Sequence, residues 1–247
     1  MTPSICAIFC VVLATHLVLA EEVALPSSVK TCKKDSEDYS SCLRLALQES
    51  WPTFSNGIPE FDLPRLDPYD IDFQESVYEN GEVRGKVTVR DVKTYGLSKI
   101  RFLSVRPHHE EGRFRLEIDM EIPKSFIEGD YKATGALGTF VMGGKGYFNI
   151  SMEGVRATWD LDGRVENDRW IVEHFTLLPE VRKMNIFFTD LFNGNQELNK
   201  AAMTFVNEYW PLLYHGMLPT VSKSWDEFLT NLANKVFSKI SFSKTFP

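Results

Sequence analysis

The chain has 247 residues, a formal net charge of −7 and a hydrophobic content of 43%. Nucleic acids and anionic membranes attract basic patches, so this acidic balance argues against both as partners. The 18 phenylalanines supply enough apolar surface for a thick core or for a core with a ligand inside it, and composition alone does not separate the two.

The first twenty residues have the pattern of a secretory signal peptide. They lack Lys, Arg, Asp and Glu, carry a mostly apolar run over residues 5–19, and place Val18 and Ala20 before a cleavage site. The alternative is a membrane anchor, but the run is short for a span and contains a histidine. We therefore expect residues 1–20 to be removed, residues 21–247 to form one secreted domain, and no stable membrane insertion.

Two of the four cysteines, Cys32 and Cys42, remain after removal of that segment. An even pair on an oxidising export route predicts a disulfide, with two free thiols as the alternative. Closing this loop of about eleven residues contributes roughly 3 kcal/mol in the chain-entropy model. Two cysteines without paired histidines do not make a zinc site, so no metal is expected there.

Residues 35–50 show the apolar spacing of a short helix, with Asp35 or Ser36 as its N-cap. We expect the helix to end before Pro52, because the residue that precedes a proline avoids the helical conformation. The proline-rich segment 57–71 is too apolar for a free linker. It is therefore predicted to be extended backbone laid over the core.

From about residue 72 to residue 190 the sequence predicts antiparallel strands. Residues 113–122 alternate strictly between apolar and charged side chains, which is typical of a sheet that covers a core on one face. Asn80-Gly81 and Asp162-Gly163 are two-residue hairpin signals.

Glycines cluster between residues 135 and 146 and indicate a strongly curved sheet. Within this cluster, residues 143–146 (GGKG) fail the spacing of a phosphate-binding loop and are predicted to be a tight turn between strands. The N-glycosylation sequon follows at Asn149-Ile150-Ser151, and its use requires an exposed Asn149.

From Glu197 to about Ile240 the apolar residues follow helical spacing. Pro211 and Pro219 interrupt this run, so we expect either one long helix kinked around 211–219 or two helices end to end. A one-sided sheet and a long amphipathic helix bury their apolar faces against each other. The chain is therefore predicted to be a single α+β domain.

No enzyme motif stands in the sequence. The nearest approach to a nucleophile elbow, Gly96-Leu97-Ser98-Lys99-Ile100, lacks its last glycine, and H-E-x-x-H is absent. His108 and His109 read as a solvated turn rather than a metal site. We expect no catalytic residue, no metal and no cofactor, with an acid–base pair assembled by the fold as the alternative.

A set of short motifs follows in order along nearly the whole mature chain. They are Cys32-x9-Cys42, Gly57-Ile58-Pro59, Leu63-Pro64-x-Leu66-Asp67-Pro68, Gly129-Asp130-Tyr131-Lys132-Ala133-Thr134-Gly135, Gly144-x-Gly146, Asp190-Leu191-Phe192-Asn193-Gly194-Asn195 and Val206-Asn207-Glu208-Tyr209-Trp210. Together they resemble the takeout / haemolymph juvenile-hormone-binding family of insects. Pro211 departs from the pattern, because the long helix of the family should continue there.

The resemblance implies a highly curved antiparallel sheet wrapped around a long C-terminal helix, a super-roll related to tubular lipid-binding domains, with a short N-terminal helix. It also implies a carrier in haemolymph or another extracellular fluid that binds a juvenile hormone-like terpenoid, a fatty acid or a similar molecule in an internal apolar tunnel. Circadian, feeding, courtship or chemosensory physiology is the family-level setting. We expect a monomer.

Candidate lining residues of such a tunnel are the apolar and aromatic residues of the bent strands and the long helix. They are Phe140, Met142, Tyr147, Phe148, Trp159, Phe188, Phe205 and Tyr209. Tyr147 or Tyr209 would orient a polar end of the ligand. Ordinary core packing is the alternative for each residue, and a secreted interaction or signalling protein with a solid core is the alternative for the chain.

Overall fold

One antiparallel sheet of seven strands dominates the computed structural model, which describes residues 23–80, 83–137 and 140–247. The strand order is β1-β2-β4-β5-β6, with β3 added to β4 and β7 added to β5. The strands are β1 (Tyr69–Asn80), β2 (Val83–Tyr95), β3 (Arg101–Glu110), β4 (Arg113–Leu137), β5 (Phe140–Glu166), β6 (Arg169–Thr176) and β7 (Glu180–Phe188). The N-terminal segment 1–20 lies outside the described residues.

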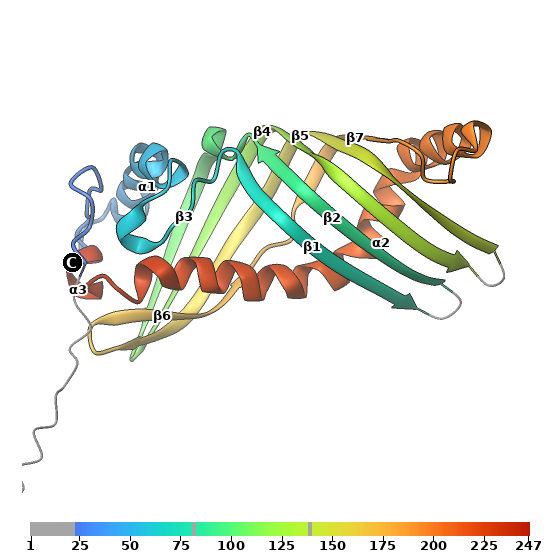
Figure 1. The fold of residues 1–247 in the computed structure, drawn as a ribbon. Coiled ribbons are helices and arrows are strands. Elements are labelled where there is room, and N and C mark those ends of the chain that lie inside the picture. The colour runs from blue at the N-terminus through green and yellow to red at the C-terminus, as the bar shows by residue number, and fades with distance from the viewer. Residues whose placement is uncertain (1–22, 81–82, 138–139) are drawn as a thin grey trace, which may run out of the picture.

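The long strands β4 and β5 divide this sheet into two ends. At the end that we call the core end, residues 113–122 of β4 pair with residues 155–164 of β5, between β3 and β6. At the distal end, residues 124–137 pair with residues 140–153, between β2 and β7. Gly154, with φ of 63°, lies at the junction. Figure 1 shows both strands bending between the two ends, so the predicted curvature is present.

The main hydrophobic core fills the core end. The predicted alternation of residues 113–122 is confirmed, because Phe114, Leu116, Ile118, Met120 and Ile122 are all buried. They pack with apolar residues of α1 (Tyr39–Ser55), β3, β6 and the end of α2 (Gln196–Phe237). The core end is therefore the part of the sheet that holds the fold together.

The helix α1 differs from its prediction at both ends. It begins at Tyr39 rather than near residue 35, and its N-cap, Asp38, makes no side-chain cap hydrogen bond. It also continues through Pro52 to Ser55. Trp51 and Ser55 are buried, and the Trp51 indole donates to Leu97 O at 2.8 Å. Tertiary packing of this last turn outweighs the local cost of the proline.

The predicted disulfide between Cys32 and Cys42 is confirmed, with a Cα–Cα distance of 5.9 Å.

The segment 57–71 is not wholly extended, because Pro59–Phe61 forms a short 3-10 helix, η1, and β1 already begins at Tyr69. Phe61 is buried in a second cluster that includes residues at the C-terminal end of α2 and just beyond it. The prediction that this segment covers a core is therefore correct, although its conformation is not.

Two of the predicted turns lie inside β5 instead. Asp162 and Gly163 pair with β4 and β6, and the turn to β6 falls at Asn167 and Asp168, which both have positive φ. A Cβ on Gly163 would lie 2.1 Å from Ile171 O. The glycine thus serves close backbone approach rather than a turn, which is the other role of glycine in strands.

The run 143–146 is likewise part of β5 rather than a turn. A Cβ on Gly144 would lie 2.0 Å from Asp190 O, because the chain that leaves β7 crosses there. The Asn80-Gly81 prediction is consistent with the antiparallel pairing of β1 and β2 up to Asn80 and Val83, while residues 81–82 lie outside the described residues.

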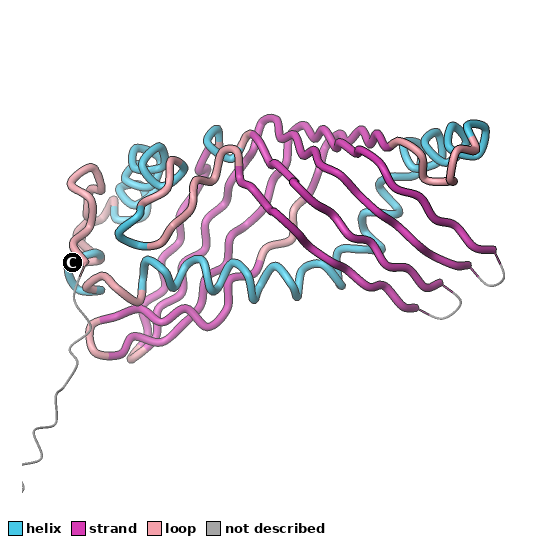
Figure 2. The backbone as a smooth tube through the Cα atoms, viewed as in Figure 1, coloured by secondary structure: helices cyan, strands magenta, loops and turns pink. Residues whose placement is uncertain are grey.

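The long C-terminal helix is continuous over 42 residues and contains both Pro211 and Pro219. Figures 1 and 2 show that α2 does not run straight, since its first turns point away from the rest of the helix. Of the two predicted arrangements, a single kinked helix is therefore correct. A last short helix, α3 (Phe242–Thr245), follows it.

Asparagine and aspartate side chains of α2 bind the free edges of β6 and β7. The Asn234 amide accepts from Val172 N–H at 2.9 Å and donates to Val172 O at 2.7 Å. The Asn207 amide makes the same pair of bonds to Ile186, at 2.8 Å and 2.7 Å. Each side chain takes the place of a further strand, which protects an edge that would otherwise pair with another chain. We call Asn207 and Asn234 the asparagine clamps.

Candidate functional site

The candidate site is the inner face of the distal end, the face that continues the core. Ser125 on β4 and Gly129 on the same strand are buried, whereas Lys124 and Asp130 are exposed, so alternate residues define this face. The cross-strand register then extends it from β4 to the neighbouring strands.

Paired residues of an antiparallel sheet lie on the same face, so the register builds rows across β4, β5 and β7. The rows share apolar or small side chains. They are Ser125, Met152, Met184; Ile127, Ile150, Ile186; Gly129, Phe148, Phe188; and Tyr131 with Gly146. They form one continuous apolar surface, and we call it the inner rows.

The inner rows are covered only in part. Ile127, Ile150 and Ile186 are each partly exposed, although they lie at the centre of the surface, whereas Phe188 is buried. The comparable residues of the core end are buried by helices and loops. Apolar surface of this kind that a protein leaves incompletely packed is characteristic of binding sites.

Tyr131 supplies a polar group within the inner rows. Its hydroxyl donates to Thr189 O, and its ring lies 6.4 Å from the Phe148 ring. Burial raises the pKa of the Tyr131 phenol to about 12, so the group is neutral at physiological pH. The described inner rows thus combine apolar side chains with neutral hydroxyls, which suits an uncharged or weakly polar ligand.

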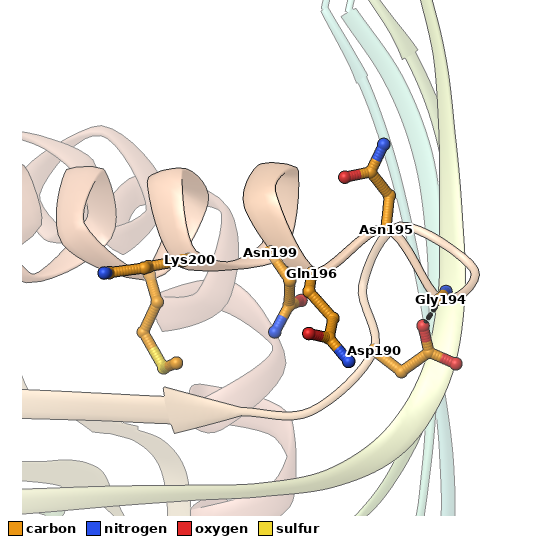
Figure 3. A pocket seen from close by; sticks show the side chains of 7 residues that line it. Asp190, Gly194, Asn195, Gln196, Asn199 and Lys200 are labelled. Atoms are coloured by element: carbon orange, nitrogen blue, oxygen red, sulfur yellow. Dashed lines mark hydrogen bonds between the residues drawn. The ribbon is translucent and has the colours of Figure 1, made fainter.

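The first turns of α2 carry two hollows at the surface. One, of about 300 Å³, is lined mostly by polar residues and by Met203; Figure 3 shows Asp190, Gly194, Asn195, Gln196, Asn199 and Lys200 around it. The other, of about 500 Å³, lies along the helix beside Ala201, Thr204, Phe205 and Tyr209, with Glu197, Lys200 and Glu208. The Phe205 and Tyr209 rings lie 5.0 Å apart and both are exposed.

The candidate lining residues from the sequence divide into several groups in the structure. Phe148 and Phe188 lie opposite each other within the inner rows. Phe205 and Tyr209 meet at the larger hollow. Trp159 lies instead at the core end, where its ring is 5.7 Å from Trp51.

Tyr147 lies on the outer face, because side chains alternate along β5, and its hydroxyl donates to Glu128 at 2.8 Å. Phe140 and Met142 belong to β5, but their side chains lie outside the described part of the structure.

Several residues of the inner rows were missed by the sequence reasoning. Ile150 and Met152 continue the alternation that begins at Phe148, and Met184 and Ile186 continue it back from Phe188. The period-two pattern was thus available in both strands. What it lacked was the register that places the two strands side by side.

Comparison with known proteins places this fold in a family. A model of the family "Haemolymph juvenile hormone binding protein (JHBP)" matches residues 6–247. The chain belongs to this family. Two relatives of this chain are both named "Circadian clock-controlled protein daywake". The one from Drosophila melanogaster is 22% identical over 231 residues, covering 90% of this chain and 88% of the relative. The one from Drosophila yakuba is 22% identical over 242 residues, covering 94% of this chain and 92% of the relative.

The family fold is also found among solved structures. Takeout 1 of Epiphyas postvittana superposes with a TM-score of 0.73 at 20% sequence identity, over 88% of this chain and 99% of that protein. The predicted architecture, a highly curved antiparallel sheet with a long C-terminal helix and a short N-terminal helix, is therefore confirmed.

Two observations hold for the part of the chain that the structure describes. Over residues 23–80, 83–137 and 140–247, no helix has both the length and the apolar character of a membrane span. Within the same ranges, His, Cys, Asp and Glu side chains do not gather in threes at a metal-binding distance.

Proposed function

We propose that this chain is a secreted carrier that holds a small lipophilic molecule against the inner rows. The observation that carries the proposal is the continuous apolar surface of the distal end, whose central residues stay partly exposed. The ligand class that fits is a juvenile hormone-like terpenoid, a fatty acid or a similar molecule. Membership of a family of binding proteins supports binding rather than catalysis as the activity.

The energetics of the proposal are sufficient without a charged anchor. Burial of about a dozen CH₂ equivalents at roughly 0.8 kcal/mol each gives on the order of 10 kcal/mol. Lost motional freedom of the ligand opposes binding by several kcal/mol. About 5–7 kcal/mol then remains, which corresponds to a dissociation constant on the order of 10–100 μM. Tyr131 is the candidate partner for a polar end of the ligand, since its ring lies 6.4 Å from the Phe148 ring within the inner rows.

The proposed cellular context rests on the N-terminal pattern and the disulfide. Residues 1–20 direct export, and residues 21–247 form the carrier domain. The Cys32–Cys42 bond fits an oxidising extracellular compartment. The name of the daywake relatives makes clock-controlled physiology the first setting in which to look for the ligand.

Titration with a fluorescent fatty-acid probe tests this function. Ile186 and Asn185 are neighbours on β7 that point to opposite faces, so Ile186→Glu and Asn185→Glu are a matched pair. We expect Ile186→Glu to weaken probe binding at least about tenfold, because the probe would bury a carboxylate. Asn185→Glu should leave it unchanged. Absence of saturable uptake by the unsubstituted chain would favour the alternative, a secreted interaction protein without a ligand.

A further inference from the structure

The outer face of the distal end carries an aromatic pair around a single asparagine. Asn149 on β5 is paired in register with Phe187 on β7 and with Glu128 on β4. The Tyr147 ring lies 6.4 Å from the Phe187 ring, at an interplanar angle of 52°. Phe187 is 38% exposed on the outer face of β7, which is an edge strand of the sheet.

Asn149 is also the first residue of the sequon Asn149-Ile150-Ser151. Because side chains alternate along a strand, Asn149 and Ser151 share the outer face while Ile150 belongs to the inner rows. Ser151 is exposed, and among the described residues the side-chain amide of Asn149 makes one long hydrogen bond, to the Tyr147 hydroxyl at 3.4 Å. The two residues that define an N-glycosylation site therefore face away from the proposed ligand.

One ring of this pair, that of Tyr147, is held in position beside the asparagine. Glu128 accepts hydrogen bonds from the hydroxyls of Tyr147, at 2.8 Å, and Tyr95, at 3.1 Å. The hydrogen bond to Glu128 also raises the pKa of the Tyr147 phenol, which keeps it protonated and donating. Fixed aromatic rings offer an apolar surface to the C–H groups of a pyranose ring.

We propose that Asn149 carries an N-linked glycan whose first sugar packs on Tyr147 and Phe187. The glycan covers the exposed phenylalanine and stabilises the distal end, where the central residues of the inner rows are only partly buried. The inference goes beyond the carrier function and shares with it only the export of the chain through the secretory route.

The test is expression of the full chain in insect cells, with mass spectrometry of the protein from the medium and from the cells. We expect a hexose-containing N-glycan on the peptide that contains Asn149, and its loss in Ser151→Ala. That variant keeps Asn149 itself, so its melting temperature reports on the glycan. It should melt about 2–4 °C below the glycosylated chain, the shift typical of one modest contact in a chain of this size.

The role of the rings is isolated by a double-mutant cycle. In Phe187→Ala the glycan should remain, but the melting difference caused by Ser151→Ala should fall by at least half. Phe73→Ala, which removes another exposed phenylalanine on the edge strand β1, should leave that difference intact.

An unmodified Asn149 in secreted protein, or a melting difference that Phe187→Ala does not change, would overturn the inference. Neither result bears on probe binding. Retention of the chain in the cells, by contrast, would contradict the extracellular carrier. In that case the cell-associated protein shows by mass spectrometry whether Asn149 carries the glycan.

Discussion

The two asparagine clamps of α2 make the same hydrogen bonds in different surroundings, so they should differ sharply in their effect on stability. Asn234 binds Val172, which is 2% exposed, whereas Asn207 binds Ile186, which is partly exposed. Replacement of Asn234 by leucine leaves a buried N–H and a buried C=O without partners. Each such group costs about 1–3 kcal/mol, so Asn234→Leu should lower the free energy of unfolding by about 4 kcal/mol.

Asn207→Leu removes the same two bonds, but water reaches the Ile186 backbone and replaces them. The expected loss is about 1 kcal/mol, the net value of an intramolecular hydrogen bond. Asn231→Leu is the matched control, because Asn231 lies on the exposed side of the same helix. It should change stability by less than about 0.5 kcal/mol.

Thermal denaturation followed by circular dichroism measures these differences. At about 2–4 °C per kcal/mol, Asn234→Leu should lower the melting temperature by about 8–16 °C. Hydrogen exchange should then show faster exchange of the Val172 amide in Asn234→Leu and of the Ile186 amide in Asn207→Leu. Equal losses for the two clamps, or an Asn234→Leu melting temperature like that of Asn231→Leu, would refute the reasoning.

Three further changes test other parts of the structure. Gly144→Ala should lower the free energy of unfolding by about 1–3 kcal/mol in chemical denaturation, because the added Cβ would overlap Asp190 O. Gly143→Ala is the control and should lower it much less, because its Cβ would lie 3.3 Å from the nearest atom. Reducing the disulfide should lower the melting temperature by about 6–12 °C, given roughly 3 kcal/mol for its loop, and a melting curve insensitive to dithiothreitol would contradict this. The hydrogen bond to Asp226, at 2.9 Å, raises the pKa of His174 in the folded protein. The stability that this hydrogen bond contributes is therefore fully present below the pKa of the unfolded state and is lost as pH rises through the higher pKa of the folded state. Melting temperature should therefore fall by about 1–3 °C between pH 6 and pH 8, and His174→Gln should remove that slope.

The parts of the fold that local patterns determine were predictable. The alternation at 113–122 and the helical spacing after Glu197 each report which face is buried, and that property is local. The kink of α2 also follows from prolines inside an apolar helical pattern. Asp162-Gly163 misled because a glycine that permits a turn also permits close contact, and only the path of β6 past Gly163 decides between the two.

The clamps and the inner rows depend on tertiary register, so the sequence did not reveal them. In the helical pattern, Asn207 and Asn234 read as ordinary surface polar residues, and their partners are fixed only when a sheet edge lies beside them. The same holds for Ile150 and Ile186, which are distant in sequence and adjacent in the sheet.

Photoaffinity labelling tests the central claim, that a lipophilic molecule binds at the inner rows, most directly. A fatty acid with a diazirine in its chain is crosslinked to the protein, and the modified peptides are located by mass spectrometry. We expect adducts on residues 146–152 and 184–188, removed by excess unlabelled fatty acid. Adducts confined to the core end or to the outer face, or labelling that competitor does not reduce, would contradict the account.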